Sequence, residues 1–153
     1  MLNQHKGFTL LELLFAVAII SLVAAIFIRP FSLFQKRELL RKETDTVAAL
    51  LEKARSSTLA SINSKQYGVH FATSSATFFQ GTAFTSEEIG NETHVFDPLV
   101  SLDSVLLQGG GRDVVFKKRT GETDFYGSIM FSVVGSISSS TIAVHRTGLI
   151  EAR

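Results

Sequence analysis

The sequence has no cysteine among its 153 residues, and neither sign of charge is in clear excess. Without cysteine the chain forms no disulfide framework and no thiolate zinc site, although its redox compartment stays open. Fifteen Lys and Arg residues oppose 14 Asp and Glu residues, so bulk charge does not indicate nucleic-acid binding. Hydrophobic residues make up 45% and charged residues 19%, which excludes an intrinsically disordered chain. The length fits one ordinary domain with a buried core.

Catalytic motifs are also missing. The four histidines, His5, His70, His94 and His145, are scattered, with no pair at a metal-binding helical spacing. The glycine run at 109–111 is not followed by the Lys-Ser/Thr of a phosphate-binding loop. No GxSxG sequence frames a nucleophilic serine. We therefore expect a protein that is not an enzyme, with no cofactor and no metal.

One long apolar run stands out near the N-terminus. Phe8–Ile28 is 21 residues long, and Glu12 is its one charged residue. At 1.5 Å per residue a helix of this length spans about 31 Å, close to the hydrocarbon core of a bilayer. A core helix of a soluble protein would be amphipathic, whereas this segment is apolar on every side. The run predicts a helix that enters a membrane.

Two general interpretations leave Glu12 unexplained. A secretory signal peptide would use Lys6 in its basic region and the small residues 23–25 at its cleavage site. A plain transmembrane anchor would also fit the length of the run. In both, a carboxylate in an apolar helix costs roughly 2.5–3.5 kcal/mol if it lies deep in the bilayer. Glu12 therefore favours an interpretation that supplies a cation.

The residues from Lys6 to Glu12, KGFTLLE, supply such an interpretation. This short basic stub, glycine, phenylalanine and glutamate before an apolar helix resemble the class III signal of type IV prepilins and pseudopilins. The resemblance implies that a membrane aspartyl peptidase cleaves between Gly7 and Phe8 on the cytoplasmic side and methylates the new N-terminal Phe8. It also implies that the apolar helix is kept, first as a membrane anchor and then in the core of a filament.

Each residue of this motif has an expected role. Gly7 lets the scissile bond lie extended in a narrow protease site, and Lys6 keeps the stub cytoplasmic. In a bundle of helices the Glu12 carboxylate can pair with the Phe8 amine of a neighbouring subunit. The alternative is an interfacial carboxylate that never pairs. Pro30 cannot donate an intrahelical hydrogen bond, so it should kink or locally melt the helix.

The helical pattern continues beyond Pro30. Leu40, Val47, Leu51 and Ala54 recur at helical spacing, and the pattern extends to about Ile62. The opposite face carries charges of both signs that are either solvated or turned toward other subunits, at residues Lys36, Arg37, Glu38, Arg41, Lys42, Glu43, Asp45, Glu52, Lys53 and Arg55. The expected result is one helix of about 50 residues, apolar first and amphipathic later.

The rest of the chain predicts short antiparallel strands packed on the helix. They are expected at 67–71, 76–79, 105–107, 113–117, 128–134 and 141–145, with a last one within 148–153. The stretch from Gln80 to Asp103 is expected to be irregular. The predicted fold class is α+β and pilin-like, divided into a leader (1–7), a transmembrane helix (8–29), an amphipathic helix (30–65) and a β-rich head (66–153).

Two features resemble the H-type pseudopilin and FimT-like minor pilin branch of this family. Ala54–Ser57, ARSS, is similar to an A-R-S segment near the end of the helix in that branch. Residues 141–148, ending in Gly148, are similar to its late strand. The branch often has an arginine after this glycine, but here the residue is Leu149, and Arg146 precedes the glycine instead. A major pilin or a G-type major pseudopilin is the rival interpretation.

Charge is segregated along the head. No Lys or Arg occurs from Gln66 to Gly111, whereas four cations then follow within eight residues: Arg112, Lys117, Lys118 and Arg119. Such separation suits head-to-tail contacts between subunits, and it is equally typical of an ordinary solvated hairpin. DNA binding by these cations together with Arg146 and Arg153 is a further alternative, which the nearby carboxylates disfavour. Asn91 heads a glycosylation sequon that carries no further information without the host.

The sequence as a whole predicts a structural subunit, preferably a minor one, of a type IV pilus or type II secretion pseudopilus. Its expected partners are the prepilin peptidase, other pilins or pseudopilins and the bacterial inner membrane, with the head in the periplasm. Two alternatives stay open. One is a DNA-binding minor pilin of a DNA-uptake pilus. The other is a membrane-anchored protein that has a ligand-binding β head and does not polymerise.

Overall fold

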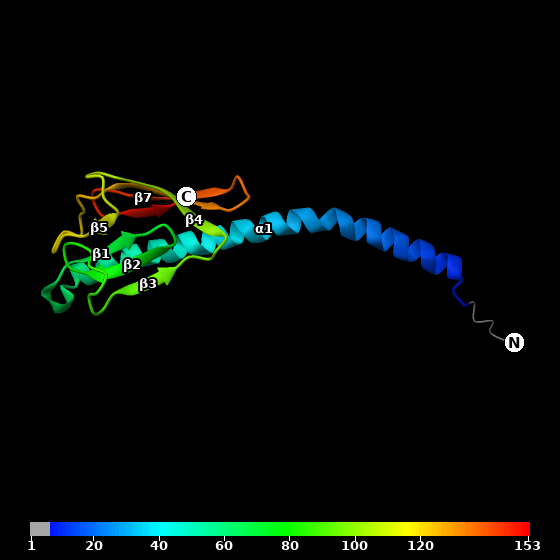
Figure 1. Cartoon of the computed structure of the whole chain (residues 1–153), viewed down its shortest axis with the longest axis horizontal. Coiled ribbons are helices and arrows are strands. Elements are labelled where there is room, and N and C mark those ends of the chain that lie inside the picture. The colour runs from blue at the N-terminus through cyan, green and yellow to red at the C-terminus, as the bar shows by residue number, and fades with distance from the viewer. Residues whose placement is uncertain (1–6) are drawn as a thin grey trace. The chain divides into compact units, whose positions relative to one another are not determined.

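The computed structural model describes residues 7–153, with the exception of the side chains of residues 26–32. The chain forms two compact units, Met1–Gln35 and Lys36–Arg153. Helix α1 runs from Leu10 to Leu59, and its 50 residues confirm the predicted length. The second unit contains the end of α1 and all the strands, and we call it the head (Figure 1).

The head contains eight strands in two antiparallel four-stranded sheets. The sequence predicted antiparallel strands but not their division into two sheets. The first sheet has the order β3-β2-β1-β5 and the second the order β4-β6-β7-β8. In chain order the strands are β1 (Tyr67–Phe71), β2 (Ser75–Gln80), β3 (Glu92–Val95), β4 (Val100–Leu107), β5 (Asp113–Val115), β6 (Gly127–Val133), β7 (Ser139–Val144) and β8 (Ile150–Ala152).

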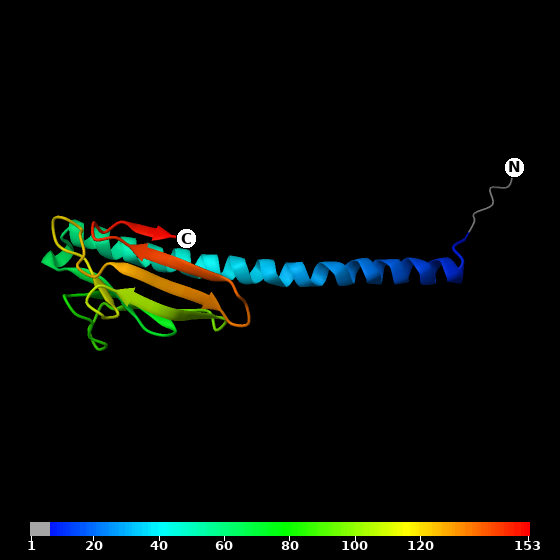
Figure 2. The same ribbon diagram turned by 90° about the horizontal axis from the view of Figure 1, so that it is seen from above.

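Both sheets share one core with the end of α1. Leu40, Val47, Leu51 and Ala54 are buried on the helix, as the spacing predicted. They belong to the same apolar cluster as Phe71 of the first sheet and as residues of the second, including Ile129, Phe131 and Ile142. Figure 2 shows the strands of the second sheet, from yellow-green β4 to red β8, running along the helix. The apolar stripe of α1 therefore determines where both sheets lie.

Helix α1 ends earlier than the sequence indicated. The α-helix stops at Leu59, and Ile62 lies in a short 3-10 helix, η1 (Ile62–Ser64), with its side chain half exposed. Ser61 and Asn63 both have a φ of 51°, a left-handed conformation that ends a helix. The extension of the buried face to Ile62 is thus wrong, because the backbone reverses before it.

A buried hydroxyl joins the end of α1 to the first strand. Thr58 is fully buried, and its Oγ1 donates to the carbonyl of Ala54 (2.8 Å) and accepts from the backbone N–H of Tyr67 (2.9 Å). The Tyr67 hydroxyl in turn donates to the carbonyl of Ile62 (3.2 Å). These bonds satisfy backbone groups at the reversal, which would otherwise be costly to bury.

Strand β3 was missed by the sequence analysis, and two side-chain contacts with α1 explain its position. Glu92–Val95 lies in the stretch expected to be irregular, and β4 also begins there. Lys53 of α1 pairs with Glu92 (2.5 Å between Nζ and Oε2). Glu43 of α1, expected on the charged outer face, is only 6% exposed and contacts the His94 imidazole at 2.6 Å. The expected position of Glu43 is therefore wrong.

The two features that resemble the H-type branch meet in the head. Arg55 donates from Nε to the carbonyl of Gly121 (3.4 Å), and Gly148 lies against both groups. A Cβ at Gly148 would lie 1.9 Å from the Gly121 carbonyl oxygen and 2.9 Å from Arg55 Nε. Gly148 also has a φ of 81°, in the left-handed region. Glycine is required here for close approach as well as for backbone conformation.

We expect Gly148→Ala to destabilise the head by about 3 kcal/mol or more, because it adds a backbone clash to left-handed strain. Gly110→Ala is the matched control, since Gly110 has a φ of 73° but nothing within 4 Å of its Cβ position. The control should lose only about 1–2 kcal/mol. Urea unfolding of the full chain in detergent, followed by tyrosine fluorescence, measures both. Equal losses would contradict the close approach at Gly148.

Candidate assembly site

The apolar segment begins with a helix cap that the sequence analysis did not identify. The Thr9 hydroxyl accepts a hydrogen bond from the backbone N–H of Glu12 (3.2 Å), and the Thr9 carbonyl accepts one from Leu13 (3.1 Å). Thr followed three residues later by Glu is the capping-box pattern, so TLLE in the sequence could have revealed it. Helix α1 consequently starts at Leu10, just after the expected cleavage position.

The Gly7–Phe8 bond lies outside the helix and is open to an approaching protein. Neither residue has helical structure, and the Phe8 side chain is 82% exposed. No described atom lies within 4 Å of the position that a Cβ on Gly7 would occupy. A larger side chain at Gly7 would therefore meet no obstacle within this part of the chain, and any effect on cleavage must arise in the protease.

Glu12 is the isolated charge of this segment. Its carboxylate makes no ion pair with any residue that the structure describes. The Ser21 hydroxyl, by contrast, is satisfied within the helix by the carbonyl of Val17 (2.8 Å). The surrounding apolar side chains, such as Leu10 and Phe15, are more than half exposed. The segment thus presents an apolar surface with a single unpaired carboxylate.

Three expectations for the N-terminal unit stay untested. Lys6 and the leader before Gly7 lie outside the described residues. The side chain of Pro30 is also outside them. Helix α1 is continuous through residue 30, and a kink at this proline stays a prediction. Among the described residues, no helix is long and apolar enough to cross a membrane.

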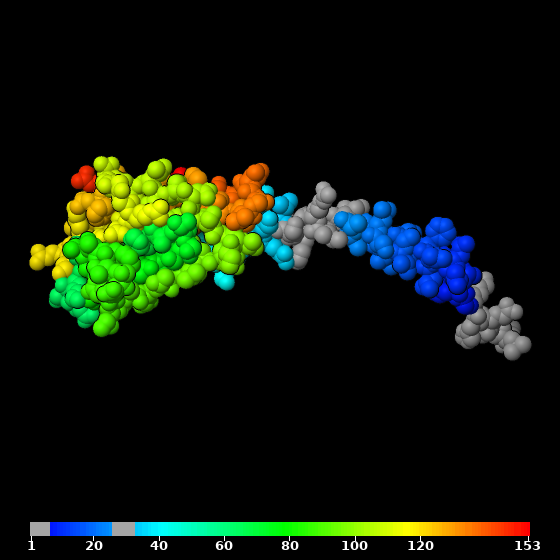
Figure 3. Space-filling view, in the orientation of Figure 1, coloured from blue at the N-terminus to red at the C-terminus, as the bar shows by residue number. Residues whose placement is uncertain are grey.

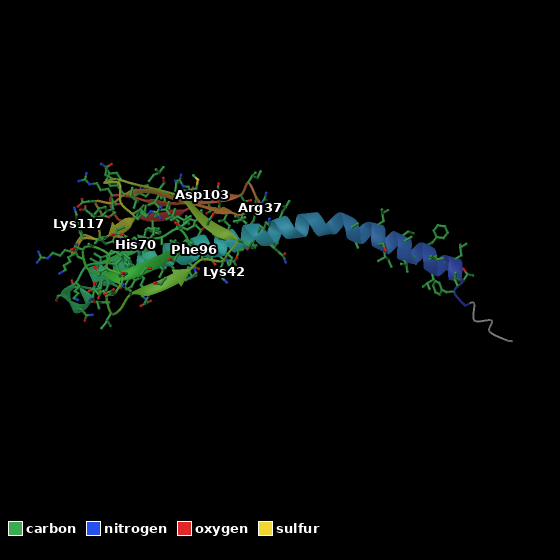
Figure 4. The ribbon with its side chains drawn as sticks, viewed as in Figure 1. Arg37, Lys42, His70, Phe96, Asp103 and Lys117 are labelled. Carbon is green, nitrogen blue, oxygen red and sulfur yellow. The ribbon has the colours of Figure 1, made fainter. Side chains whose placement is uncertain are left out.

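The structure does not gather the six candidate cations of the head into one patch. Lys117 and Lys118 follow β5 at the end of the head where α1 finishes, and Figure 4 shows Lys117 far from Arg37. Lys117 pairs with Asp124 (2.6 Å), and Lys118 donates to the carbonyl of Ser64. Arg119 follows in the same turn, where its φ is 70°.

Of the other three candidate cations, Arg146 lies beside this turn, and Arg112 and Arg153 lie elsewhere in the head. Arg146 follows β7, and its carbonyl accepts from the backbone of Thr123. Arg112 donates to the carbonyl of Phe71 (3.5 Å), the last residue of β1. The Arg153 guanidinium contacts Glu151 (2.8 Å), and this hydrogen bond holds the pKa of the Glu151 carboxyl below its ordinary value.

The histidines of the head have structural partners. His70 Nδ1 lies 2.6 Å from Asp113, and its ring stacks on Phe84 with 4.1 Å between centroids. His94 contacts Glu43, and His145 lies 3.6 Å from Glu151. Within the described residues, no three His, Cys, Asp or Glu side chains converge as metal ligands would. These contacts join strands to their neighbours and to the helix.

Comparison with known proteins gives a match to the N-terminal segment and a match to the fold. Residues 2–28 match the prokaryotic N-terminal methylation motif. The fold resembles that of the minor pseudopilin EpsH from the Type 2 Secretion System of Vibrio cholerae, at a TM-score of 0.56 and 12% sequence identity. That match covers 74% of this chain and 95% of the EpsH chain. No curated protein sequence matches this chain significantly.

The chain combines the methylation motif with a long N-terminal helix and an antiparallel head. These features support the resemblance to type IV prepilins and pseudopilins that the N-terminal residues indicated. Its fold class is the α+β fold that the sequence predicted.

We expect Thr9→Ala to fray the start of α1, because it removes the acceptor of the Glu12 N–H. Loss of such a cap costs about 0.5–2 kcal/mol, which corresponds to amide exchange roughly 2- to 30-fold faster. Hydrogen exchange of the full chain in detergent micelles measures this at Glu12. Ser21→Ala removes a hydroxyl of the same helix that caps nothing, and it should leave the Glu12 amide unchanged. Similar effects from both would argue against the cap.

Proposed function

We propose that the chain is a structural subunit of a filament, either a type IV pilus or a type II secretion pseudopilus. The observation that carries this proposal is the exposed apolar start of α1, which has one unpaired carboxylate and lies within the methylation motif. An apolar helix of this kind needs either lipid or other helices around it. In a filament, helices of neighbouring subunits supply that cover.

Maturation precedes assembly in this proposal. A prepilin peptidase cleaves between Gly7 and Phe8, and Phe8 becomes the methylated N-terminus. The bond lies before the helix and beside an open position at Gly7, as a protease substrate requires. Lys6 stays with the leader on the cytoplasmic side, in agreement with the positive-inside bias.

Glu12 then positions the subunit in the bundle. A mature subunit carries a positive amine on Phe8, and the unpaired Glu12 carboxylate of a neighbour is a suitable partner for it. In an apolar surrounding, two separate charges are far more costly than a neutral pair. The pair therefore favours one axial register of neighbouring helices over others.

A minor subunit is the preferred role within the filament. The head folds like a minor pseudopilin, and the Arg55 and Gly148 features of the H-type branch pack together. Leu149 in place of the branch's arginine weakens any transfer of a specific binding role. Before assembly the subunit resides in the bacterial inner membrane through residues 8–29, with its head in the periplasm.

We propose no catalytic activity. DNA binding is less favoured than a structural role, because Arg112 and Arg153 lie away from the other four candidate cations, and Lys117 and Arg153 already pair with carboxylates. The Asn91 amide donates to the carbonyl of Thr85 (2.8 Å), so a glycan attached there would leave one N–H for this contact.

Gly7→Val should leave the precursor uncleaved, because the added side chain enters the protease site while meeting nothing in this chain. Gly7→Ala should be cleaved at a reduced rate. The measurement is the intact mass of the chain after co-expression with a prepilin peptidase, where wild type loses residues 1–7 and gains one methyl group. Normal maturation of Gly7→Val would mean that the cleavage site is assigned incorrectly.

Glu12→Ala should be cleaved and inserted normally but should fail to enter filaments. Removing the carboxylate leaves the Phe8 ammonium of a neighbour buried without a partner, at a cost of about 3–5 kcal/mol before relaxation. Immunoblots that compare purified filaments with the membrane pool measure incorporation.

Thr9→Ala is the matched control for Glu12, because it disturbs the helix cap and keeps the carboxylate. If only Glu12→Ala is excluded from filaments, the charge is responsible. If both variants are excluded, an intact helix start is required as well as the charge, because Glu12→Ala keeps the backbone N–H that Thr9 caps. Wild-type incorporation of Glu12→Ala would remove the pairing role of this carboxylate.

A further inference from the structure

A basic groove lies between α1 and the hairpin that joins β6 to β7. It has a volume of about 660 Å³, and its walls include Arg37 and Arg41 of the helix, Ile137 and Ser139 of the hairpin, and Arg153 after β8. Ile137 is fully exposed at the hairpin tip (relative exposure 105%), and Figure 3 shows this hairpin in orange on the head surface. All these residues belong to the head unit.

Positive charge predominates in this groove. Arg37 makes no ion pair with a described residue. Arg41 lies 3.8 Å from Asp45, and the side chains of Arg41 and Asp45 are both largely exposed. Arg153 also lines the groove, although it contacts Glu151. An exposed isoleucine among arginines favours a partner that is acidic and carries an apolar side chain.

The opposite end of the head presents such a partner surface. The loop between β2 and β3 contains residues 85–90, TSEEIG, and Ile89 is 96% exposed. Glu87 and Glu88 make no ion pair with any described residue. No Lys or Arg occurs nearby in sequence, since the whole stretch from 66 to 111 lacks them. We call residues 85–90 the acidic loop.

The acidic loop is held in place at its base. The Phe84 ring stacks on His70, and the Phe84 backbone N–H donates to Asp113 (3.4 Å). The Asn91 side chain closes the other side by donating to the carbonyl of Thr85 (2.8 Å). A loop fixed at both ends loses little conformational entropy on binding, so its exposed isoleucine is a preorganised contact.

We propose that the acidic loop of one copy of this chain binds in the basic groove of a second copy. Ile89 would contact Ile137, while Glu87 and Glu88 would face Arg37 and Arg41. The β6–β7 hairpin, orange, and the acidic loop, green, lie at opposite ends of the head in Figures 1 and 2. A contact between different surfaces at opposite ends is heterologous, so it adds copies in one direction, as a filament requires.

This inference rests on the proposed filament function and goes beyond it, because it names a contact between two copies. A minor subunit would accordingly occur in short runs rather than singly. Processing and filament incorporation are measured separately from the contact between heads. A cleaved and incorporated chain without that contact would overturn only this inference, whereas an uncleaved chain would overturn the function itself.

Cysteine crosslinking tests the contact cleanly, because the natural chain has no cysteine. Two full-length, differently tagged variants, Ser86→Cys in the acidic loop and Ser139→Cys in the groove, are co-expressed with the prepilin peptidase. A disulfide forms only when the two Cα atoms come within about 4.4–6.8 Å. We expect a dimer that carries both tags, and a ladder of higher species when both cysteines are in one chain.

The matched control replaces the loop cysteine by Leu106→Cys, an exposed apolar position on β4 outside the loop. It should crosslink to Ser139→Cys several-fold less, as should two copies of Ser86→Cys. Equal crosslinking of the control would show random collision and overturn the proposal. Crosslinking of Ser86→Cys to a different pilin, with none between copies, would overturn it in favour of a heteromeric contact.

Charge reversal tests the chemistry of the contact. On the two-cysteine background, Glu87→Lys with Glu88→Lys should lower the crosslinked fraction several-fold, and Arg37→Glu with Arg41→Glu in the second copy should restore it. Glu122→Lys, an exposed charge outside the loop, should have no effect. Raising the salt from 0.15 M to 1 M should also reduce crosslinking, because the screening length falls from about 8 Å to about 3 Å. Crosslinking that is indifferent to both reversals would overturn the proposal.

Discussion

The apolar stripe on the second part of α1 is the constraint on which the head depends. Leu40, Val47, Leu51 and Ala54 are nearly inaccessible to solvent, and both sheets bury their inner faces against them. The first part of the same helix has no such cover within the described residues, and its apolar side chains stay exposed. One helix therefore stabilises a head with one part and requires an external partner for the other.

Much of this arrangement could be predicted from the sequence, because apolar spacing directly reflects burial. The helix length and most strands followed from it, including β1 at its observed bounds. The misses have a common cause. Strand β3 is short and mostly exposed, and Glu43 is buried in contact with His94, which lies 51 positions further along the chain. Such tertiary pairs override local pattern, and nothing near either residue in the sequence indicates them.

The N-terminal motif and the surface of the head differ in how far the sequence could predict them. The N-terminal motif is local, so roles for Gly7, Phe8 and Glu12 could be predicted from adjacent residues, and the Thr9 cap could have been predicted in the same way. The head surface is not local. Arg153 and Arg37 are distant in sequence but line one groove, whereas Lys117 and Arg112 are close in sequence and lie apart. A run of like charges in a sequence says little about where those charges lie when strands separate them.

The charges that remain unpaired within the head and helix differ in how strongly they would act between subunits. Glu12 lies on an apolar helix, where a pair with an amine would be shielded from salt and would tolerate little misplacement. Glu87, Glu88 and Arg37 are at the protein surface, where each pair contributes less and is screened. The buried pair would thus decide whether a subunit enters the bundle. The contact between heads would instead select which neighbour follows it, because weak, screened contacts discriminate between partners without preventing their exchange.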